Sequence, residues 1–214
     1  MSLIVPAILS PTPEEYKAGL EKVHTFVNRV HVDFSDGSFA PTQTIPVNQI
    51  WWPQGWQVDI HAMVGDPNQY VDLLISMHPS LIIFHSEAQV DLLPILQKVK
   101  AAGIKAGLAL MRSTVPSDVA GLIEVADHVM IFSGDLGKYG GTASMMQLEK
   151  IRLIKNINNG VEIGWDGGVT VEIAFNLSQG GVDVLYVGKA IQQAADPKAA
   201  YDALVSELNK QGAI

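Results

Sequence analysis

Two histidines and two aspartates lie where predicted strands end, and together they form a ligand set for one divalent metal ion. His31 and Asp33 belong to the segment VHVDFSDG, His61 to VDIHAMV and Asp166 to GWDGG. Imidazole and carboxylate ligands suit Zn²⁺, Fe²⁺, Mn²⁺ or Co²⁺, and of these we favour Zn²⁺. The same two carboxylates could move a proton off one face of a carbon atom and onto the other. If the three segments meet in the fold, the chain is a metal-dependent enzyme.

The spacing of these residues argues for a site, although a lone histidine at a strand end is more often structural. His31 and Asp33 are two residues apart, so on a strand their side chains point to the same side. Asp59 and His61 repeat the pair in reverse order on the next strand. Asp59 precedes His61 by two residues and so lies farther from the end of the strand. We interpret it as a buried carboxylate of the barrel interior, or one that supports the ligands, and not as a ligand itself.

Glycine-rich segments that follow three predicted strands form a candidate anion site. Glycine lets backbone N–H groups approach an anion closely, and a lysine there adds a local positive charge. In any single loop these would be read as turn glycines, but their presence in consecutive loops favours a phosphate site. The residues are Gly137, Gly140 and Gly141, then Gly167 and Gly168 after Asp166, and finally Gly188 and Lys189.

Short apolar runs, which predict strands, alternate along the whole chain with longer amphipathic stretches, which predict helices. Most of the runs are almost continuously apolar, as expected where both faces of a parallel sheet are covered. The predicted strands are residues 3–9, 29–34, 57–63, 81–85, 105–110, 128–132, 162–165 and 184–187. The predicted helices are residues 13–27, 67–77, 90–102, 116–125, 144–158, 171–179 and 197–210, with a short one near 47–51.

Strands that are each followed by a helix or a loop predict an α/β fold, a single (β/α)8 TIM barrel over residues 1–214. The alternative is an open doubly wound sheet. The number of strands and the lack of a glycine-rich turn after the first strand favour the barrel. In such a barrel the C-terminal ends of the strands meet on one face and form the active site, and the polar residues lie there.

The composition predicts a soluble cytoplasmic protein. A net charge of −8 argues against nucleic acid and anionic membrane surfaces as partners. There are no cysteines, so disulfides, thiolate nucleophiles and cysteine metal sites are excluded. The first apolar run is short and ends in Ser-Pro-Thr-Pro, so it predicts a strand and not a signal peptide. No apolar stretch approaches the about 20 residues needed to cross a bilayer.

Short motifs spread from the first predicted strand to the last match one enzyme family. They are VPAILSPT, HVDFSDGSFAP, VDIHAMV, FHSEA with His85 and Glu87, KAGLAL, WDGGV and VGKAI. In this order they resemble the ribulose-phosphate 3-epimerase family, and the match runs nearly end to end. The resemblance implies His31, Asp33, His61 and Asp166 as ligands of one divalent metal ion. It implies Asp33 and Asp166 as the catalytic pair. It also implies substrate contacts from Ser10, His61, Met63, Gly140, Gly141, Gly167, Gly168, Gly188 and Lys189.

The resemblance implies an isomerase that inverts C3 of a ketose phosphate. The reaction would convert ribulose 5-phosphate to xylulose 5-phosphate, a step of the pentose phosphate pathway, by two-aspartate proton transfer through an enediolate. The implied partner is a small-molecule sugar phosphate. A homo-oligomer is expected by resemblance alone, since family members commonly assemble into dimers or hexamers.

The chain departs from the family pattern around the sugar and phosphate pockets. Ser35 and Phe132 stand where the family usually has methionine, and Lys189 replaces a small serine-like residue. Met111-Arg112 replaces Asn-Pro, and GDLGKYGGT replaces a loop close to NPGFGGQ. Two alternatives follow: an epimerase for another ketose or ketose phosphate, or a non-catalytic barrel that binds a sugar phosphate. The four retained metal positions argue against the second, because a drifting protein should lose its ligands early.

Overall fold

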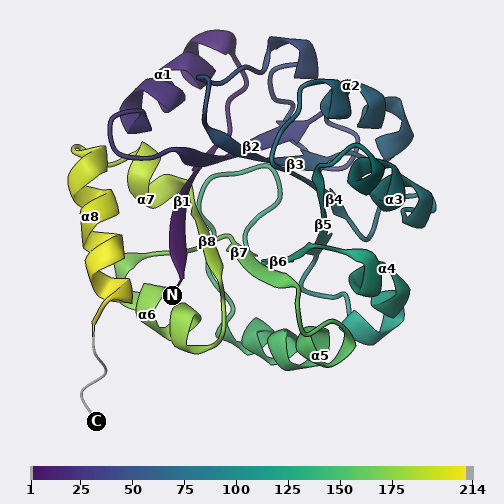
Figure 1. The fold of residues 1–214 in the computed structure, drawn as a ribbon. Helices are drawn as coiled ribbons and strands as arrows, with labels where there is room; N and C mark the ends of the chain where they lie inside the picture. Colours follow the sequence, from purple (N-terminus) through teal and green to yellow (C-terminus); the bar gives the residue numbers. More distant parts are fainter. Residues whose placement is uncertain (1, 211–214) are drawn as a thin grey trace.

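The computed structural model describes residues 2–210, in which eight parallel strands form a ring with the helices outside it (Figure 1). The strands follow one another around the ring in chain order, and the last pairs with the first, Leu3 lying opposite Val184. This confirms the predicted (β/α)8 barrel. The strands are β1 (Leu3–Ile8), β2 (Arg29–Ser35), β3 (Gln57–Met63), β4 (Leu81–His85), β5 (Lys105–Leu110), β6 (His128–Phe132), β7 (Glu162–Asp166) and β8 (Val184–Val187).

Most of the helices are shorter than the predicted ones, although the helix predicted over residues 171–179 has the predicted bounds, and several helices begin with a 3-10 turn. The predicted helix 90–102 begins only at Leu93, because Pro94 is tolerated in a first turn but not deeper in a helix. The helices predicted from residues 67, 116 and 144 start with 3-10 turns, which are frequent at helix N-termini. The α-helices are α1 (Pro13–Val23), α2 (Val71–Ser76), α3 (Leu93–Ala101), α4 (Ala120–Val125), α5 (Glu149–Ile157), α6 (Val171–Gln179), α7 (Lys189–Gln192) and α8 (Pro197–Leu208). The 3-10 helices are η1 (Val47–Gln49), η2 (Pro67–Gln69), η3 (Pro116–Val119) and η4 (Met145–Leu148).

Side chains alternate along each strand between the barrel interior and the surrounding helices. The outward-facing residues, such as Val32, Ile60 and Trp165, belong to the large apolar core between the strands and the helices. A smaller apolar cluster, which includes Ile83 and Met130, fills part of the interior. Because the helices bury the outer face completely, polar groups for chemistry can come only from the inward-facing positions and the loops.

A buried polar network closes the end of the barrel where the strands begin. We call Arg29, Asp59, His128, Glu162 and Tyr186 the barrel floor. The Arg29 guanidinium lies 2.9 Å from Asp59 Oδ2 and 3.1 Å from Glu162 Oε2, and the Tyr186 hydroxyl donates to Asp59 Oδ2 at 3.0 Å. His128 Nδ1 lies 2.8 Å from Glu162 Oε2. The interpretation of Asp59 as a carboxylate inside the barrel is thereby confirmed.

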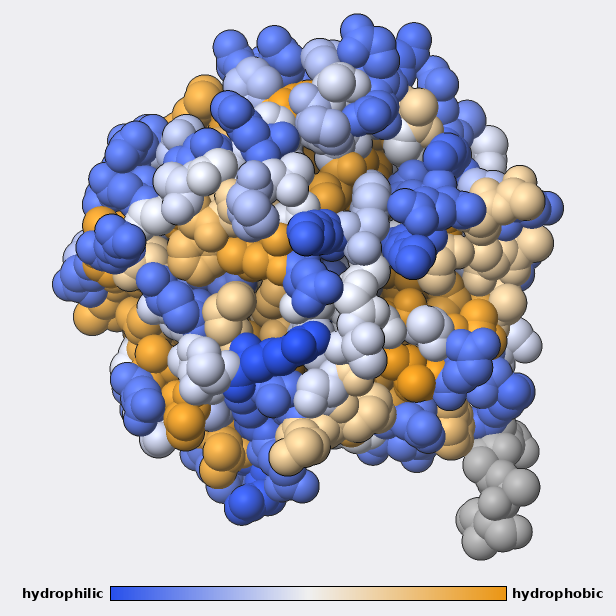
Figure 2. All heavy atoms as spheres, turned by 180° about the vertical axis from the view of Figure 1, so that it is seen from behind, coloured by the Kyte–Doolittle hydropathy of each residue, from blue (hydrophilic) through white to orange (hydrophobic). Residues whose placement is uncertain are grey.

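The outer surface carries few large apolar side chains among the described residues. Seen from the side opposite to Figure 1, hydrophilic residues predominate around the rim, and apolar patches show between them, the broadest left of the centre and at the right (Figure 2). The exposed large apolar residues are Leu3, Trp51, Leu73, Leu93, Val115 and Met146, and they come from separate elements. None of the helices in residues 2–210 combines the length and the apolar composition that crossing a membrane requires.

Candidate active site

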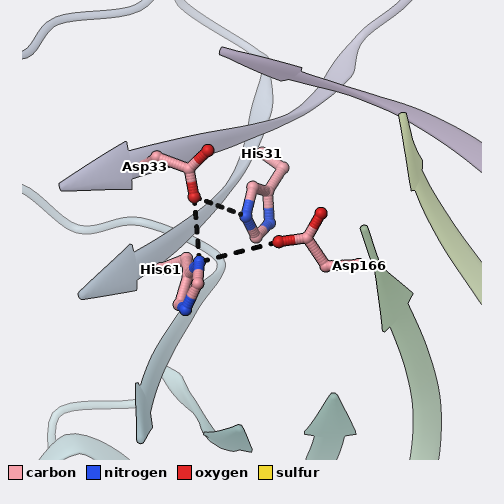
Figure 3. A group of neighbouring side chains, drawn as sticks. All are labelled: His31, Asp33, His61 and Asp166. Atoms are coloured by element: carbon pink, nitrogen blue, oxygen red, sulfur yellow. Dashed lines mark hydrogen bonds and ion pairs between the residues drawn. The ribbon is translucent and has the colours of Figure 1, made fainter. Parts of the chain in front are cut away.

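The four residues singled out as metal ligands lie together, with Asp33, His61 and Asp166 toward the C-terminal ends of their strands and His31 two residues before Asp33 (Figure 3). Each offers one ligand atom, and these atoms all lie within 4.8 Å of one another. Asp33 Oδ1 lies 3.2 Å from His31 Nε2 and 2.8 Å from His61 Nδ1, and Asp166 Oδ2 lies 3.9 Å from His61 Nδ1. The structure therefore brings together residues of β2, β3 and β7 as the sequence predicted.

Strand register explains why these side chains converge. β2 and β3 pair so that Asp33 lies opposite His61, and the alternation of side chains places His31 on the same inner side. Asp166 is the last residue of β7, which does not pair with β2 or β3. It reaches the cluster only because the sheet closes on itself. Both imidazoles are fully buried, whereas the Asp33 and Asp166 side chains are 11% and 15% exposed.

The two carboxyl groups of the site differ in acidity. Burial, followed by the negative charge of Asp33, raises the pKa of Asp166 above its usual range. Burial also acts to raise the pKa of Asp33, but the charge and hydrogen bond of His31 and the hydrogen bond of His61 outweigh it and hold that pKa below its usual range. The two carboxyl groups of the metal-free site therefore differ in acidity.

The donor set fits one divalent cation. Two imidazole nitrogens and two carboxylate oxygens form a mixed set typical of such ions in proteins. His31 Nε2 and His61 Nδ1 both face Asp33, and the fully buried rings offer these atoms to a shared point. Burial lowers the pKa of His61, so its ring favours the neutral form that can ligate a metal.

A second layer of polar residues, to which sequence reasoning gave no role, lies behind His61. His85 Nε2 lies 2.8 Å from His61 Nε2, and His85 Nδ1 lies 3.3 Å from Glu87 Oε2. Glu87 Oε1 accepts hydrogen bonds from the Met111 N–H at 2.9 Å and from the Thr114 hydroxyl. The signal was present in the sequence: His85 ends β4 two residues beyond Ile83, the residue paired with His61.

A cavity opens above the two aspartates. Asp33, Asp166, Met63, Phe132 and Tyr139 contribute to its wall. Of the other predicted substrate contacts, Gly140, Gly167, Gly168, Gly188 and Lys189 also line it. Gly141 lies in an adjoining hollow, Ser10 lines a neighbouring cavity beside α1, and His61 is buried below the wall.

Close backbone contact shapes the rim of this cavity. The loop after β6 (residues 133–144) packs directly on the turn that follows Asp166. A Cβ atom on Gly167, whose φ is +102°, would lie 2.0 Å from Gly134 N, and one on Gly168 would lie 2.2 Å from Ala143 N. Tyr139 fixes the same loop from the other side, because its hydroxyl accepts a hydrogen bond from the Leu9 N–H at 2.7 Å.

Comparison with known proteins identifies the family of this chain. The model of the ribulose-phosphate 3-epimerase family matches residues 3–192. Ribulose-phosphate 3-epimerase of Helicobacter pylori is 31% identical over 208 residues, which covers 94% of this chain and 95% of that protein. The chloroplastic ribulose-5-phosphate-3-epimerase of Arabidopsis thaliana is 30% identical over 178 residues, or 78% of this chain and 63% of that protein.

Solved structures with low sequence identity share the fold. 3-Hexulose-6-phosphate synthase from Salmonella typhimurium gives a TM-score of 0.72 at 20% identity and covers 97% of this chain and 98% of that chain. KGPDC from Streptococcus mutans also gives a TM-score of 0.72, at 10% identity, with 97% of each chain covered. At these identities the likeness concerns the barrel and not the chemistry.

Proposed function

Because the chain belongs to the ribulose-phosphate 3-epimerase family and is an isomerase of carbohydrate metabolism, we propose that it interconverts ribulose 5-phosphate and xylulose 5-phosphate with the help of one divalent metal ion. The observation that carries this proposal is the cluster of two histidines and two aspartates below the cavity. Two aspartates that line one cavity suit the inversion of a carbon centre. The single-domain organisation and the homo-oligomeric state stay predictions.

His31, Asp33, His61 and Asp166 are the proposed ligands of the metal ion, for which Zn²⁺ is our first choice. When bound, the ion supplies Lewis acidity that stabilises negative charge on the substrate oxygens. The buried imidazoles keep the site in a low-dielectric environment, where such stabilisation is stronger than in water.

Asp33 and Asp166 are the proposed catalytic residues. One of them takes the proton from C3 as general base and leaves an enediolate. The other returns a proton to C3 from the opposite face, which inverts the centre. The residues come from β2 and β7, which are not neighbours in the sheet, so they approach the cavity from separate directions.

The glycine-rich rim and Lys189 are the proposed phosphate site. The proposed contacts to the anion are the backbone amides of Gly140, Gly141, Gly167, Gly168 and Gly188. The Lys189 side chain lies beside Gly140. A Cβ atom on Gly140 would lie 2.9 Å from Lys189 Cδ. Met63 lines the cavity as an apolar wall for the sugar, whereas the contact of Ser10 with substrate stays a prediction.

A second candidate is an epimerase of another ketose or ketose phosphate. Phe132 lines the cavity where the family usually has methionine, and Lys189 lies at the rim in place of a small residue. Both changes alter the volume and charge that meet the substrate and leave the four proposed ligands untouched. Rates on a panel of ketoses, each with and without its phosphate, separate this candidate from the first.

The test of the proposal is uptake of deuterium at C3 of ribulose 5-phosphate in D2O, followed by NMR. A chelator should abolish the exchange and added Zn²⁺ should restore it. Asp33→Asn and Asp166→Asn should each abolish it, whereas Asp118→Asn, an exposed aspartate outside the cavity, should not. Metal content of each variant separates lost ligation from lost proton transfer. Full deuterium exchange at C3 in Asp33→Asn or Asp166→Asn would refute the assignment of that aspartate as a catalytic residue.

A further inference from the structure

We propose that His85 and Glu87 are positioning residues, which hold the His61 ring so that its Nδ1 lone pair faces the metal site. This inference rests on the proposed function, because it concerns the ligand role of His61. It goes beyond that function because it assigns a role to His85 and Glu87, which contact neither the proposed ion nor the reacting carbon.

The starting point is the contact between two imidazole rings. His61 Nδ1 faces Asp33 Oδ1 at 2.8 Å, so its other nitrogen, Nε2, is the one that faces His85 Nε2 at 2.8 Å. A hydrogen bond between two ring nitrogens needs one donor and one acceptor, so the proton positions on the two rings are linked. Whichever nitrogen of His85 carries the proton therefore decides which nitrogen of His61 is free to ligate.

Glu87 decides the proton position on His85. A carboxylate only accepts hydrogen bonds, and Glu87 Oε1 already accepts from the Met111 N–H and the Thr114 hydroxyl. Burial acts to raise the pKa of Glu87, but hydrogen bonds from His85, Thr114 and the Met111 N–H bring it to about 2, so the group is ionised. Oε2 faces His85 Nδ1 at 3.3 Å, which makes that nitrogen the donor.

The position of the proton on His61 follows from the number of protons on the two rings. Both rings are fully buried, which favours neutral imidazoles with one proton each. His85 keeps its proton on Nδ1, so its Nε2 accepts a hydrogen bond from His61 Nε2–H. His61 Nδ1 then carries a lone pair, and this is the form in which histidine binds a metal ion.

Contacts with several elements hold His85 and Glu87 in place. His85 ends β4 and its ring packs against Phe39 at 4.7 Å and Phe132 at 5.7 Å between ring centroids. Glu87 is tied to the segment after β5 through Met111 and Thr114. His31 differs, because its Nδ1 has no hydrogen-bond partner among residues 2–210. The two histidine ligands are therefore supported unequally, because among the described residues the second ring nitrogen has a hydrogen-bond partner only in His61.

The test is metal affinity, measured by competition between the metal-free protein and a chromogenic chelator for Zn²⁺. Removal of such an outer partner lowers metal affinity about 10–100-fold, and we expect this for His85→Ala and a smaller loss for Glu87→Gln. His85→Gln should recover most of the affinity, since an amide oxygen can accept from His61 Nε2–H. The absorption spectrum of the Co²⁺ protein should change in His85→Ala. Phe39→Leu is the matched control, because it alters the packing on His85 without removing a hydrogen bond.

The outcomes separate the two proposals. A wild-type protein that binds Zn²⁺, with a His85→Ala variant that binds it equally well and keeps the Co²⁺ spectrum, overturns only this inference. A wild-type protein that binds no Zn²⁺ overturns the proposed function and this inference together. If His85→Ala does not fold, the comparison of Glu87→Gln with His85→Gln decides, and equal, wild-type affinities in both overturn the inference. Thermal unfolding of each metal-free variant identifies a failure to fold.

Discussion

Replacement of Gly167 by alanine should reduce activity sharply while the barrel still folds. Gly167 follows Asp166, has a φ of +102° and lies against the loop after β6. An added Cβ would lie 2.0 Å from Gly134 N and 2.2 Å from Gly134 Cα. Because both contacts are to backbone atoms, no side chain can turn aside to relieve them.

The size of the effect follows from these distances. Real Cβ contacts essentially never fall under 3.0 Å, so the turn and the loop must separate by about 1 Å. A misplacement of about 1 Å at catalytic groups can cost about 100-fold in rate, which corresponds to about 2.7 kcal/mol in the barrier. The left-handed backbone conformation adds about 1–2 kcal/mol of strain, which appears as lost stability and not as lost activity.

The assay measures kcat and KM for ribulose 5-phosphate together with the free energy of unfolding in urea. Gly103→Ala is the matched control, since Gly103 also has a positive φ, of +77°, but a Cβ there meets nothing within 4 Å. The control should lose stability and keep its kcat. Gly167→Ala should lose both, with the larger change in kcat because Asp166 moves.

The reasoning fails if Gly167→Ala keeps most of the wild-type kcat while it is folded. It fails equally if Gly103→Ala loses as much activity as Gly167→Ala, because the loss would then come from backbone strain in general.

Two further predictions concern the barrel floor and the phosphate site. Burial acts to raise the pKa of Glu162, but the hydrogen bonds and charges of His128 and Arg29 outweigh it and bring the pKa from 4.5 to about 2. A lowered pKa stabilises the fold above the unfolded value, so this group should contribute about 3 kcal/mol at neutral pH that is lost as the pH falls from about 5 to about 2. The free energy of unfolding of Glu162→Gln, measured in urea at several pH values, should lack this loss at low pH. If Glu162→Gln loses as much stability at low pH as the wild-type protein, Glu162 does not make this contribution. Lys189→Met should raise KM for ribulose 5-phosphate about tenfold with little change in kcat, because about 1.4 kcal/mol of uniform phosphate binding is lost. An unchanged KM in steady-state assays would show that Lys189 does not bind the phosphate.

The strands and the four clustered residues were predictable because both depend on local pattern. Continuous apolar runs mark strands that are covered on both faces, and the two-residue spacing of His31 and Asp33 fixes their shared side. The barrel fold then explains why residues of different strands converge, since every strand of a barrel ends on the same face. Asp166 needed no further signal than its place at the end of its strand.

The supporting residues were harder to predict because their partners lie far apart in the sequence. Glu87 contacts Thr114 from another loop, and Arg29 meets Glu162 across the barrel. The hydrophobic periodicity of a sequence does not indicate which distant residues contact each other. Three α-helices begin later than predicted because a 3-10 turn precedes them, and a fourth begins only at Leu93 because Pro94 must lie in its first turn.

Closure of the strand ring has a consequence for the order in which the protein forms. Three of the proposed ligands come from β2 and β3, but Asp166 comes from β7, nearly half of the chain later. A nascent chain that has emerged only through β4 can present three donors and lacks the fourth. Contacts of such long sequence separation form late, since the entropy of closing the intervening chain must be overcome first. A metal ion that needs all four donors therefore binds only the closed ring, and it shifts the folding equilibrium toward that ring by mass action.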